Sequence, residues 1–191
     1  GPNATSVRAG ATSNVFNTVT LPTGVTAVDF AVGYRTLLIL GSNGNLYASG
    51  DQMYRGNATG SINQTTPLVL VTQPPTSVAG LGGIQQIEAG RSSYYVLDVD
   101  GTIHVLGENS DGQLGDNTTT DRTSWTKVGA GGCSGGVLDN VVYISAVGTH
   151  DENSKSASAI LADGTLRSWG DNDQHAIGGP VDGTIYDCPL I

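Results

Sequence analysis

Apolar residues in this chain occur in short runs that are separated by glycine-containing turns. In the segments 46–49 and 103–106, apolar residues occupy alternate positions, which is typical of a strand with one buried face. The runs 36–40 (TLLIL) and 94–97 (YYVL) are almost continuously apolar, as expected for strands that are covered on both faces. Because the chain also contains 28 glycines and abundant Thr and Ser, the pattern predicts an all-β protein of short strands and tight turns.

The same arrangement of strands and turns occurs three times along the chain. In each copy a first strand ends in glycine, a second strand leads to an Asn-Gly or Asp-Gly turn, and a third strand ends in glycine. Asn-Gly and Asp-Gly suit the positive φ angles of two-residue hairpins, so each copy predicts a three-stranded antiparallel unit. In copy order, the glycines are Gly33, Gly90 and Gly148 after the first strand, Gly44, Gly101 and Gly164 in the hairpin, and Gly50, Gly107 and Gly170 after the third strand.

A fourth strand is available to the first two copies. Segments 67–71 (PLVLV) and 124–128 (SWTKV) follow the first and second copies, and residues 189–191 begin an equivalent segment after the third. Segment 15–22 (VFNTVTLP) is typical of such a fourth strand, but no first three strands precede it. The chain therefore predicts three four-stranded sheets with incomplete units at both ends.

Two segments carry a resemblance to a known family. Segment 161–170 (LADGTLRSWG) and the element Gly112-Gln113-Leu114-Gly115 resemble the signature of RCC1-like (regulator of chromosome condensation) repeats, which form β-propellers. The resemblance implies a partial β-propeller of about three four-stranded blades with incomplete end blades. Its predicted segments are an N-terminal extension (1–13), an outer strand of a preceding or partner blade (14–24), blade 1 (25–82), blade 2 (83–140) and blade 3 (141–191, with an incomplete last strand).

Three blades are fewer than a closed propeller needs, and an open stack would expose apolar sheet faces to water. Three explanations are open. The chain is a piece of a longer protein, it binds another chain that carries the missing blades, or copies of it join. If copies join, segment 15–22 of one subunit is expected to complete the third sheet of its neighbour by strand addition.

The charge of the chain restricts its partners. Seventeen acidic residues against eight basic ones give a formal net charge of −9, which disfavours binding to nucleic acid because phosphates would be repelled. No stretch approaches the roughly 20 apolar residues that span a bilayer, so no membrane insertion is expected.

The sequence carries no nucleophile elbow, phosphate loop or paired metal motif, so we expect no enzyme activity, no cofactor and no metal site. The three histidines share no ligand spacing, and we expect them on the surface or in blade packing. Asp111, Asp116 and Asp121 lie among Gly and Asn as calcium ligands do, but they lack the EF-hand positions, and we interpret them as turn residues.

The third copy contains an insertion. Gly148 and Gly164 are 16 residues apart, whereas the equivalent glycines of the other copies are 11 apart. Polar loops between framework strands often carry recognition, so the insertion is our candidate partner-contact loop; the alternative is a tolerated surface insertion. The candidate contact residues are His150, Asp151, Glu152, Asn153 and Lys155.

The cysteines and sequons bear on the location of the protein. Cys133 and Cys188 can form one disulfide or remain as structural thiols. Four Asn-X-Ser/Thr sequons lie in predicted terminal or loop segments, where glycans could be attached, and together with the scarcity of Lys they favour an extracellular or cell-surface location. The sequons are Asn3, Asn57, Asn63 and Asn117.

These observations lead to three functional hypotheses. The first is a non-catalytic protein-interaction or adhesion module of a secreted or cell-surface protein or assembly, since a propeller displays loops on a rigid frame. The second is a regulator of a small GTPase that acts like a guanine-nucleotide exchange factor, an activity that the family resemblance implies. The third is a structural subunit of an extracellular filament joined by strand exchange. The expected partners are other proteins or further copies of the chain.

Overall fold

The computed structural model describes residues 18–34, 36–50, 68–71, 74, 83–131, 133, 136–148, 155–172, 177–178 and 188. Within these residues the chain is all-β, as predicted, and contains no helix that could cross a membrane. The strands are β1 (Ala27–Val32), β2 (Thr36–Gly41), β3 (Leu46–Gly50), β4 (Val69–Val71), β5 (Ile84–Ala89), β6 (Ser93–Asp98), β7 (Ile103–Gly107), β8 (Arg122–Lys127), β9 (Val141–Gly148), β10 (Lys155–Leu161) and β11 (Leu166–Gly170).

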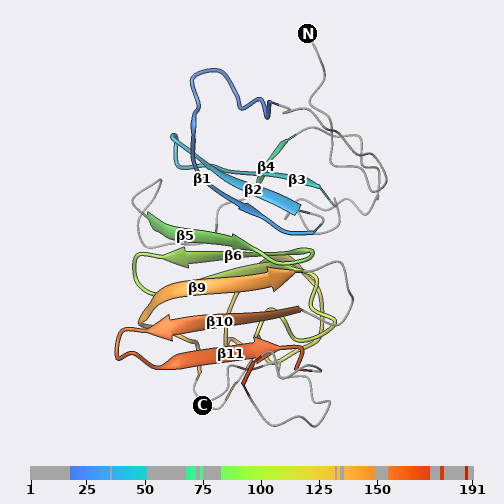
Figure 1. The fold of residues 1–191 in the computed structure, drawn as a ribbon, viewed down its shortest axis with the longest axis vertical. Helices are drawn as coiled ribbons and strands as arrows, with labels where there is room; N and C mark the ends of the chain where they lie inside the picture. The colour runs from blue at the N-terminus through green and yellow to red at the C-terminus, as the bar shows by residue number, and fades with distance from the viewer. Residues whose placement is uncertain are drawn as a thin grey trace.

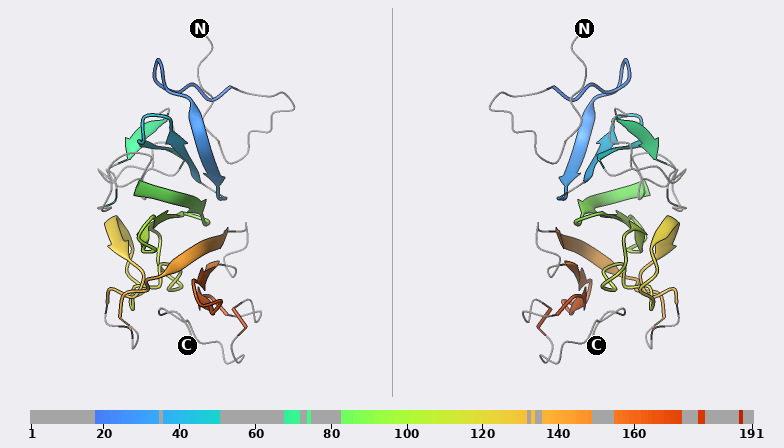
Figure 2. Two further views of the ribbon diagram at one scale, coloured as in Figure 1. Left: turned by 90° about the vertical axis from the view of Figure 1, so that its left-hand side faces the viewer. Right: turned by 90° about the vertical axis from the view of Figure 1, so that its right-hand side faces the viewer.

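The strands form three antiparallel sheets in which neighbours in sequence are neighbours in space. Two sheets have four strands, in the orders β1-β2-β3-β4 and β5-β6-β7-β8, and the third has the order β11-β10-β9. The sheets are stacked one after another, and the second lies between the other two (Figure 1). Their first strands β1, β5 and β9 lie along one side of the stack, and β4 and β8 lie on the opposite side (Figure 2). This is the predicted partial β-propeller, and we refer to the sheets as blades 1, 2 and 3.

The repeated glycines have two different roles. The hairpin glycines adopt left-handed φ angles, for example 80° at Gly101. Gly107 and Gly170, which end the third strands of blades 2 and 3, are needed because the backbone at the start of the neighbouring strand comes close. A Cβ on Gly107 would lie 2.4 Å from the carbonyl oxygen of Ser92, and one on Gly170 would lie 2.4 Å from that of Lys155. Turn geometry and close backbone approach together explain why glycine recurs at these positions.

Two apolar interfaces hold the blades together, and strand β6 is buried along its whole length between them. This burial explains its continuous apolar run. The interface of blades 1 and 2 is built from Ala31, Leu38, Leu40, Leu46, Ala48, Val71, Ile84, Ile87, Ala89, Tyr94, Val96 and Leu106. The interface of blades 2 and 3 is built from Tyr95, Leu97, Ile103, Val105, Leu114, Val128, Val141, Ile144, Ala157, Ala159 and Trp169.

The Gly-Gln-Leu-Gly element joins blade 2 to blade 3. The carbonyl oxygen of Gln113 accepts hydrogen bonds from the Tyr95 hydroxyl (2.8 Å) and from Trp169 Nε1 (2.9 Å). Leu114 and Trp169 are fully buried, and Gly115 has a φ of 62° directly against the indole ring. The element therefore seats the tryptophan of the next blade.

A glutamine links the first strands of blades 2 and 3. The side-chain amide of Gln86 donates to the carbonyl oxygen of Ile144 (2.7 Å) and accepts from the Ile144 amide (3.0 Å). Gln85 donates to the carbonyl oxygen of Val142 (3.0 Å). A carboxamide has one donor and one acceptor side, so it can pair with the N–H and C=O of a single residue. Gln86 therefore links β5 to β9 in the way that a residue of a neighbouring strand would.

The predicted fourth strands have mixed outcomes. Segment 67–71 contains β4, and segment 124–128 overlaps β8. Residues 18–22 of the predicted strand 15–22 form no strand, while residues 15–17 and 189–191 lie outside the described part of the chain. The three sheets fall within the predicted segments 25–82, 83–140 and 141–191, whose boundaries remain predictions.

Candidate functional site

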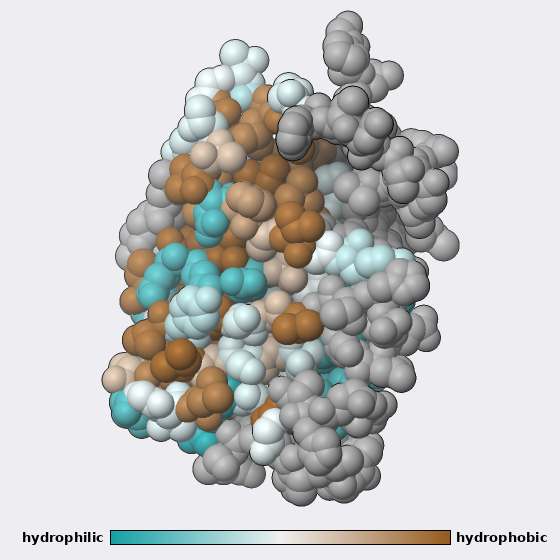
Figure 3. All heavy atoms as spheres, in the orientation of Figure 1, coloured by the Kyte–Doolittle hydropathy of each residue, from teal (hydrophilic) through white to brown (hydrophobic). Residues whose placement is uncertain are grey.

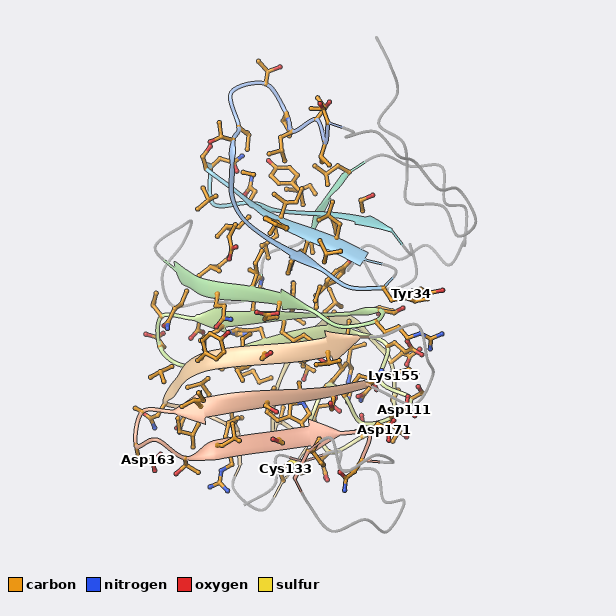
Figure 4. The ribbon with its side chains drawn as sticks, in the orientation of Figure 1. Tyr34, Asp111, Cys133, Lys155, Asp163 and Asp171 are labelled. Carbon is orange, nitrogen blue, oxygen red and sulfur yellow. A yellow bond between two sulfur atoms is a disulfide. The ribbon has the colours of Figure 1, made fainter. Side chains whose placement is uncertain are left out.

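Loops at one end of the strands, on the same side of all three blades, carry charged side chains. Tyr34 after β1, Asp111 after β7, Lys155 at the start of β10 and Asp171 after β11 all lie at this end (Figure 4). Asp163, in the hairpin between β10 and β11, lies at the opposite end. We call the first end the loop side.

Lys155 is the centre of an ionic cluster on the loop side. Its Nζ donates to Asp111 Oδ2 (2.6 Å), Glu108 Oε1 (3.0 Å) and Ser110 Oγ (3.0 Å). Only 6% of the lysine side chain is exposed. A lysine at the start of blade 3 thus joins the turn that follows the third strand of blade 2.

Burial by itself lowers the pKa of Lys155, but the hydrogen bonds and negative charges of Asp111 and Glu108 outweigh it, so the pKa is raised. The amine therefore stays a cation at neutral pH. The carboxylates of Asp111 and Glu108 balance its charge, and the cluster holds the start of β10 in blade 3 against the turn after β7 in blade 2.

Arg91 extends the cluster toward blade 1. Its guanidinium lies 3.8 Å from Glu108 Oε1 and stacks over the ring of Tyr34 at 5.9 Å from the ring centroid. Tyr34 comes from blade 1, Arg91 and Glu108 from blade 2, and Lys155 from blade 3. The loop side is therefore a surface that all three blades build together.

The acidic turn after β7 is held by bonds within the chain. Asp116 accepts from Arg122 Nε (2.6 Å) and from Asn109 Nδ2 (3.0 Å), and Asp121 accepts from the Asn109 amide (2.8 Å). These contacts agree with the interpretation of Asp111, Asp116 and Asp121 as turn residues. In the described part of the chain, no three His, Cys, Asp or Glu side chains are grouped so that they could hold a metal ion.

The predicted site residues have separate environments. His150, Asp151, Glu152 and Asn153 lie outside the described residues, so the partner-contact loop remains a prediction. Its fifth member, Lys155, points into the blade interface described above. The sequence showed the insertion but not this inward orientation, because the acidic partners of Lys155 are more than forty positions away (|i−j| of 44 for Asp111 and 47 for Glu108).

The two cysteines form a disulfide that links the loop after β8 to the segment after β11. Asn117 lies beside it, with its Oδ1 3.2 Å from Cys188 Sγ and its Nδ2 donating to the carbonyl oxygen of Gly131 (2.9 Å). Of the other sequons, Asn3, Asn57 and Asn63 lie outside the described residues, and glycosylation remains a prediction.

His104 is buried in blade packing. Its Nε2 lies 2.9 Å from Asp98 Oδ2, and Asp98 Oδ1 accepts from the amides of Asp100 and Thr102 in the hairpin. His150 and His175 lie outside the described part of the chain. The histidine that the structure describes thus braces a hairpin.

Comparison with known proteins identifies the fold. No family model and no curated protein sequence matches the chain. Among solved structures, human WBSCR16 has a TM-score of 0.70 and 21% identity, over 90% of this chain and 42% of its own. Prp20p from Saccharomyces cerevisiae has a TM-score of 0.58 and 23% identity, over 87% of this chain and 36% of its own. Yeast RCC1 (Prp20) bound to Kap60 gives a TM-score of 0.58 and 22% identity, over 87% and 35%.

These structures confirm the resemblance to RCC1-like repeats and the partial propeller fold. The chain spans less than half of the length of each. At 21–23% identity the likeness shows the fold alone.

The comparison contradicts the expected extracellular or cell-surface location. The similar structures are RCC1-like proteins of the cell interior, and histones are among the proteins whose binding to Prp20p has been described. The expectation was wrong because sequons follow easily from a composition rich in Asn, Ser and Thr, and their presence does not report a compartment.

Proposed function

We propose that this chain is part of an RCC1-like propeller that binds protein partners through its loop side and regulates a small GTPase as a guanine-nucleotide exchange factor does. The likeness to Prp20p, whose binding to Gsp1p and histones has been described, is the observation that carries the proposal. It favours this hypothesis over the adhesion module and the extracellular filament, for which the comparisons give no support.

The loop side suits protein recognition because it is rigid and polar. The Lys155 cluster and the Arg91–Tyr34 contact fix loops from three blades, so little loop entropy would be lost on binding. The carboxylates of Glu108 and Asp111 reach this surface, and the chain has a net charge of −9. We therefore expect the partner to present a basic surface.

Nucleotide exchange requires no nucleophile and no metal ligand from the exchange factor. The factor binds the nucleotide-free GTPase more tightly than the nucleotide-bound form, and this difference in affinity speeds release.

The test is a nucleotide-release assay on small GTPases from each major subfamily, loaded with a fluorescent guanine nucleotide. We expect the protein to accelerate release from at least one GTPase by tenfold or more. Failure to accelerate release from any of them would reject the exchange function.

A matched pair of variants tests the binding surface. Asp111→Asn removes a carboxylate from the loop side, and Asp163→Asn makes the same change at the opposite end. We expect the first variant to weaken GTPase binding and the second to leave it unchanged, with both checked for folding by urea denaturation. Equal effects would assign recognition to another surface.

A further inference from the structure

The loop that follows β8 is held against the Gly-Gln-Leu-Gly turn of the same blade. The amide of Gly129 donates to the carbonyl oxygen of Gly115 (2.7 Å), and Asn117 Nδ2 donates to the carbonyl oxygen of Gly131 (2.9 Å). Gly131 has no room for a Cβ, because the carbonyl group of Asp116 lies directly against it. Blade 2 by itself therefore positions the loop after β8.

The Cys133–Cys188 disulfide connects this loop to blade 3. It joins residues 55 positions apart, one in the loop after β8 and one after β11. Both cysteines are partly exposed, and neither belongs to the apolar contact of blades 2 and 3 described above. Whereas the apolar side chains exposed over blade 1 and at the β10–β11 hairpin (Figure 3) lie on the ends of the stack, the bond joins two blades that are already packed on each other. A dissolved thiol can therefore reach the bond, and the apolar contact does not depend on it.

Each sulfur atom lies near an oxygen atom that can accept a hydrogen bond from a thiol. Cys133 Sγ lies 3.9 Å from the carbonyl oxygen of Gly115, and Cys188 Sγ lies 3.2 Å from Asn117 Oδ1. The bond from Asn117 Nδ2 to Gly131 turns this oxygen toward Cys188. A disulfide sulfur has no hydrogen to donate, whereas a thiol is a weak donor, so only the reduced pair can use both acceptors. The surroundings of the two sulfurs therefore suit the reduced form as well as the oxidised one.

From these contacts we propose that the Cys133–Cys188 bond is a reversible redox link, which opens and closes while blades 2 and 3 stay packed. Its reductant is a dithiol. One thiolate of the dithiol attacks a sulfur of the pair, the S–S bond breaks, and a mixed disulfide forms; the second thiol of the reductant then displaces the protein sulfur. Two electrons and two protons pass to the protein, which ends with two thiols, and the reductant ends as a disulfide. A disulfide such as oxidised glutathione reverses the exchange.

The link controls the mobility of one junction and not the existence of the fold. Opening it releases Cys188 from the loop after β8, but Leu114 and Trp169 remain buried and the indole keeps its hydrogen bond to Gln113. Exposed disulfides are the labile ones that proteins use for regulation. This redox chemistry does not depend on the exchange function proposed above.

A redox titration of the folded protein tests reversibility. The protein is equilibrated without urea in mixtures of reduced and oxidised dithiothreitol, the free thiols are alkylated, and the mass of the intact protein counts them. We expect dithiothreitol to convert both cysteines to thiols with an unchanged far-UV circular dichroism spectrum, and oxidised glutathione to restore the bond. A bond that breaks only in denaturant, or a reduction that removes the β-sheet signal, would overturn the proposal.

Hydrogen exchange of single amides, followed by NMR before and after reduction, tests what the link restrains. The Gly136 amide donates to the carbonyl oxygen of Cys133 (2.8 Å), so we expect it to exchange about fivefold faster or more once the bond opens. The Gly129 amide, bonded to Gly115 within blade 2, is the internal control and should keep its rate. The double variant Cys133→Ser with Cys188→Ser should match the reduced protein and should not respond to dithiothreitol.

Two results of the exchange experiment contradict the proposal. An unchanged rate at Gly136 would mean that the bond restrains nothing, and this would reject it as a redox switch. Faster exchange throughout β10 and β11 would mean that reduction loosens the packed blades themselves.

Discussion

Gly115 offers a sharp test of how the blades pack. In the structure Gly115 has a φ of 62°, and a Cβ added to it would lie 2.7 Å from Cδ1 and Nε1 of Trp169. The indole is fully buried and bonded to Gln113, so it cannot move aside easily. Gly115→Ala should therefore destabilise the protein both through its backbone and through this contact.

The magnitude follows from the two contributions. An alanine in the left-handed region costs about 1–2 kcal/mol, and overpacking a buried site costs about 1–3 kcal/mol more. Gly164 provides the matched control, because its φ is 86° and a Cβ there would meet nothing within 4 Å. Gly164→Ala carries the backbone cost alone, so the difference between the two variants isolates the contact with Trp169.

The assay is urea denaturation of the oxidised protein, followed by far-UV circular dichroism. We expect the loss of unfolding free energy in Gly115→Ala to exceed that in Gly164→Ala by about 1–3 kcal/mol. In a Trp169→Leu background this excess should disappear, since the smaller side chain leaves room for the Cβ. Equal losses in the two single variants would refute the inference that Gly115 is required by the indole ring.

Three further predictions concern stability. Lys155→Met should lower the unfolding free energy by about 2–4 kcal/mol at pH 7, because it removes the cation from Asp111 and leaves Glu108 only the more distant Arg91. Because the pKa of the lysine is raised in the folded protein, its ionic contribution is present below the unfolded pKa and is lost as the pH rises through the folded pKa, which a urea series across alkaline pH would detect. Reducing the disulfide, or replacing both cysteines by serine, should lower the unfolding free energy by at most about 4 kcal/mol, given the sequence separation of 55. Urea midpoints with and without reductant measure this loss. An unchanged midpoint would mean that the bond does not constrain the unfolded chain. Burial raises the pKa of the Glu88 carboxyl, the hydrogen bond from Gln86 partly offsets this, and the charge of Asp29 raises it further. The ionised carboxylate is therefore disfavoured in the folded state. Glu88→Gln should stabilise the protein slightly at pH 7 and should have no such effect at pH values well below the unfolded pKa.

The amino-acid sequence by itself determined the repeat, the hairpins and the fold. The spacing of Gly44 and Gly50, repeated in the other two copies, is a local requirement of the backbone, so it can be recognised without knowledge of the neighbours. The continuous apolar run of β6 likewise predicted a strand that is covered on both faces by neighbouring sheets. The sequons misled the assignment of location, because a sequon reports composition and not exposure to a glycosylating compartment.

Only the tertiary structure decided what the polar side chains do. Lys155 appeared in the sequence as part of a polar insertion, and it became an internal cation only because folding brings the turn after β7 beside the start of β10. Two hydrogen bonds join residues more than fifty positions apart: Gln86 bonds to Ile144 (58 positions), and the carbonyl oxygen of Gln113 accepts from Trp169 (56 positions). Such contacts depend on how one blade lies against the next, a relation that local patterns of apolar residues and glycines do not encode.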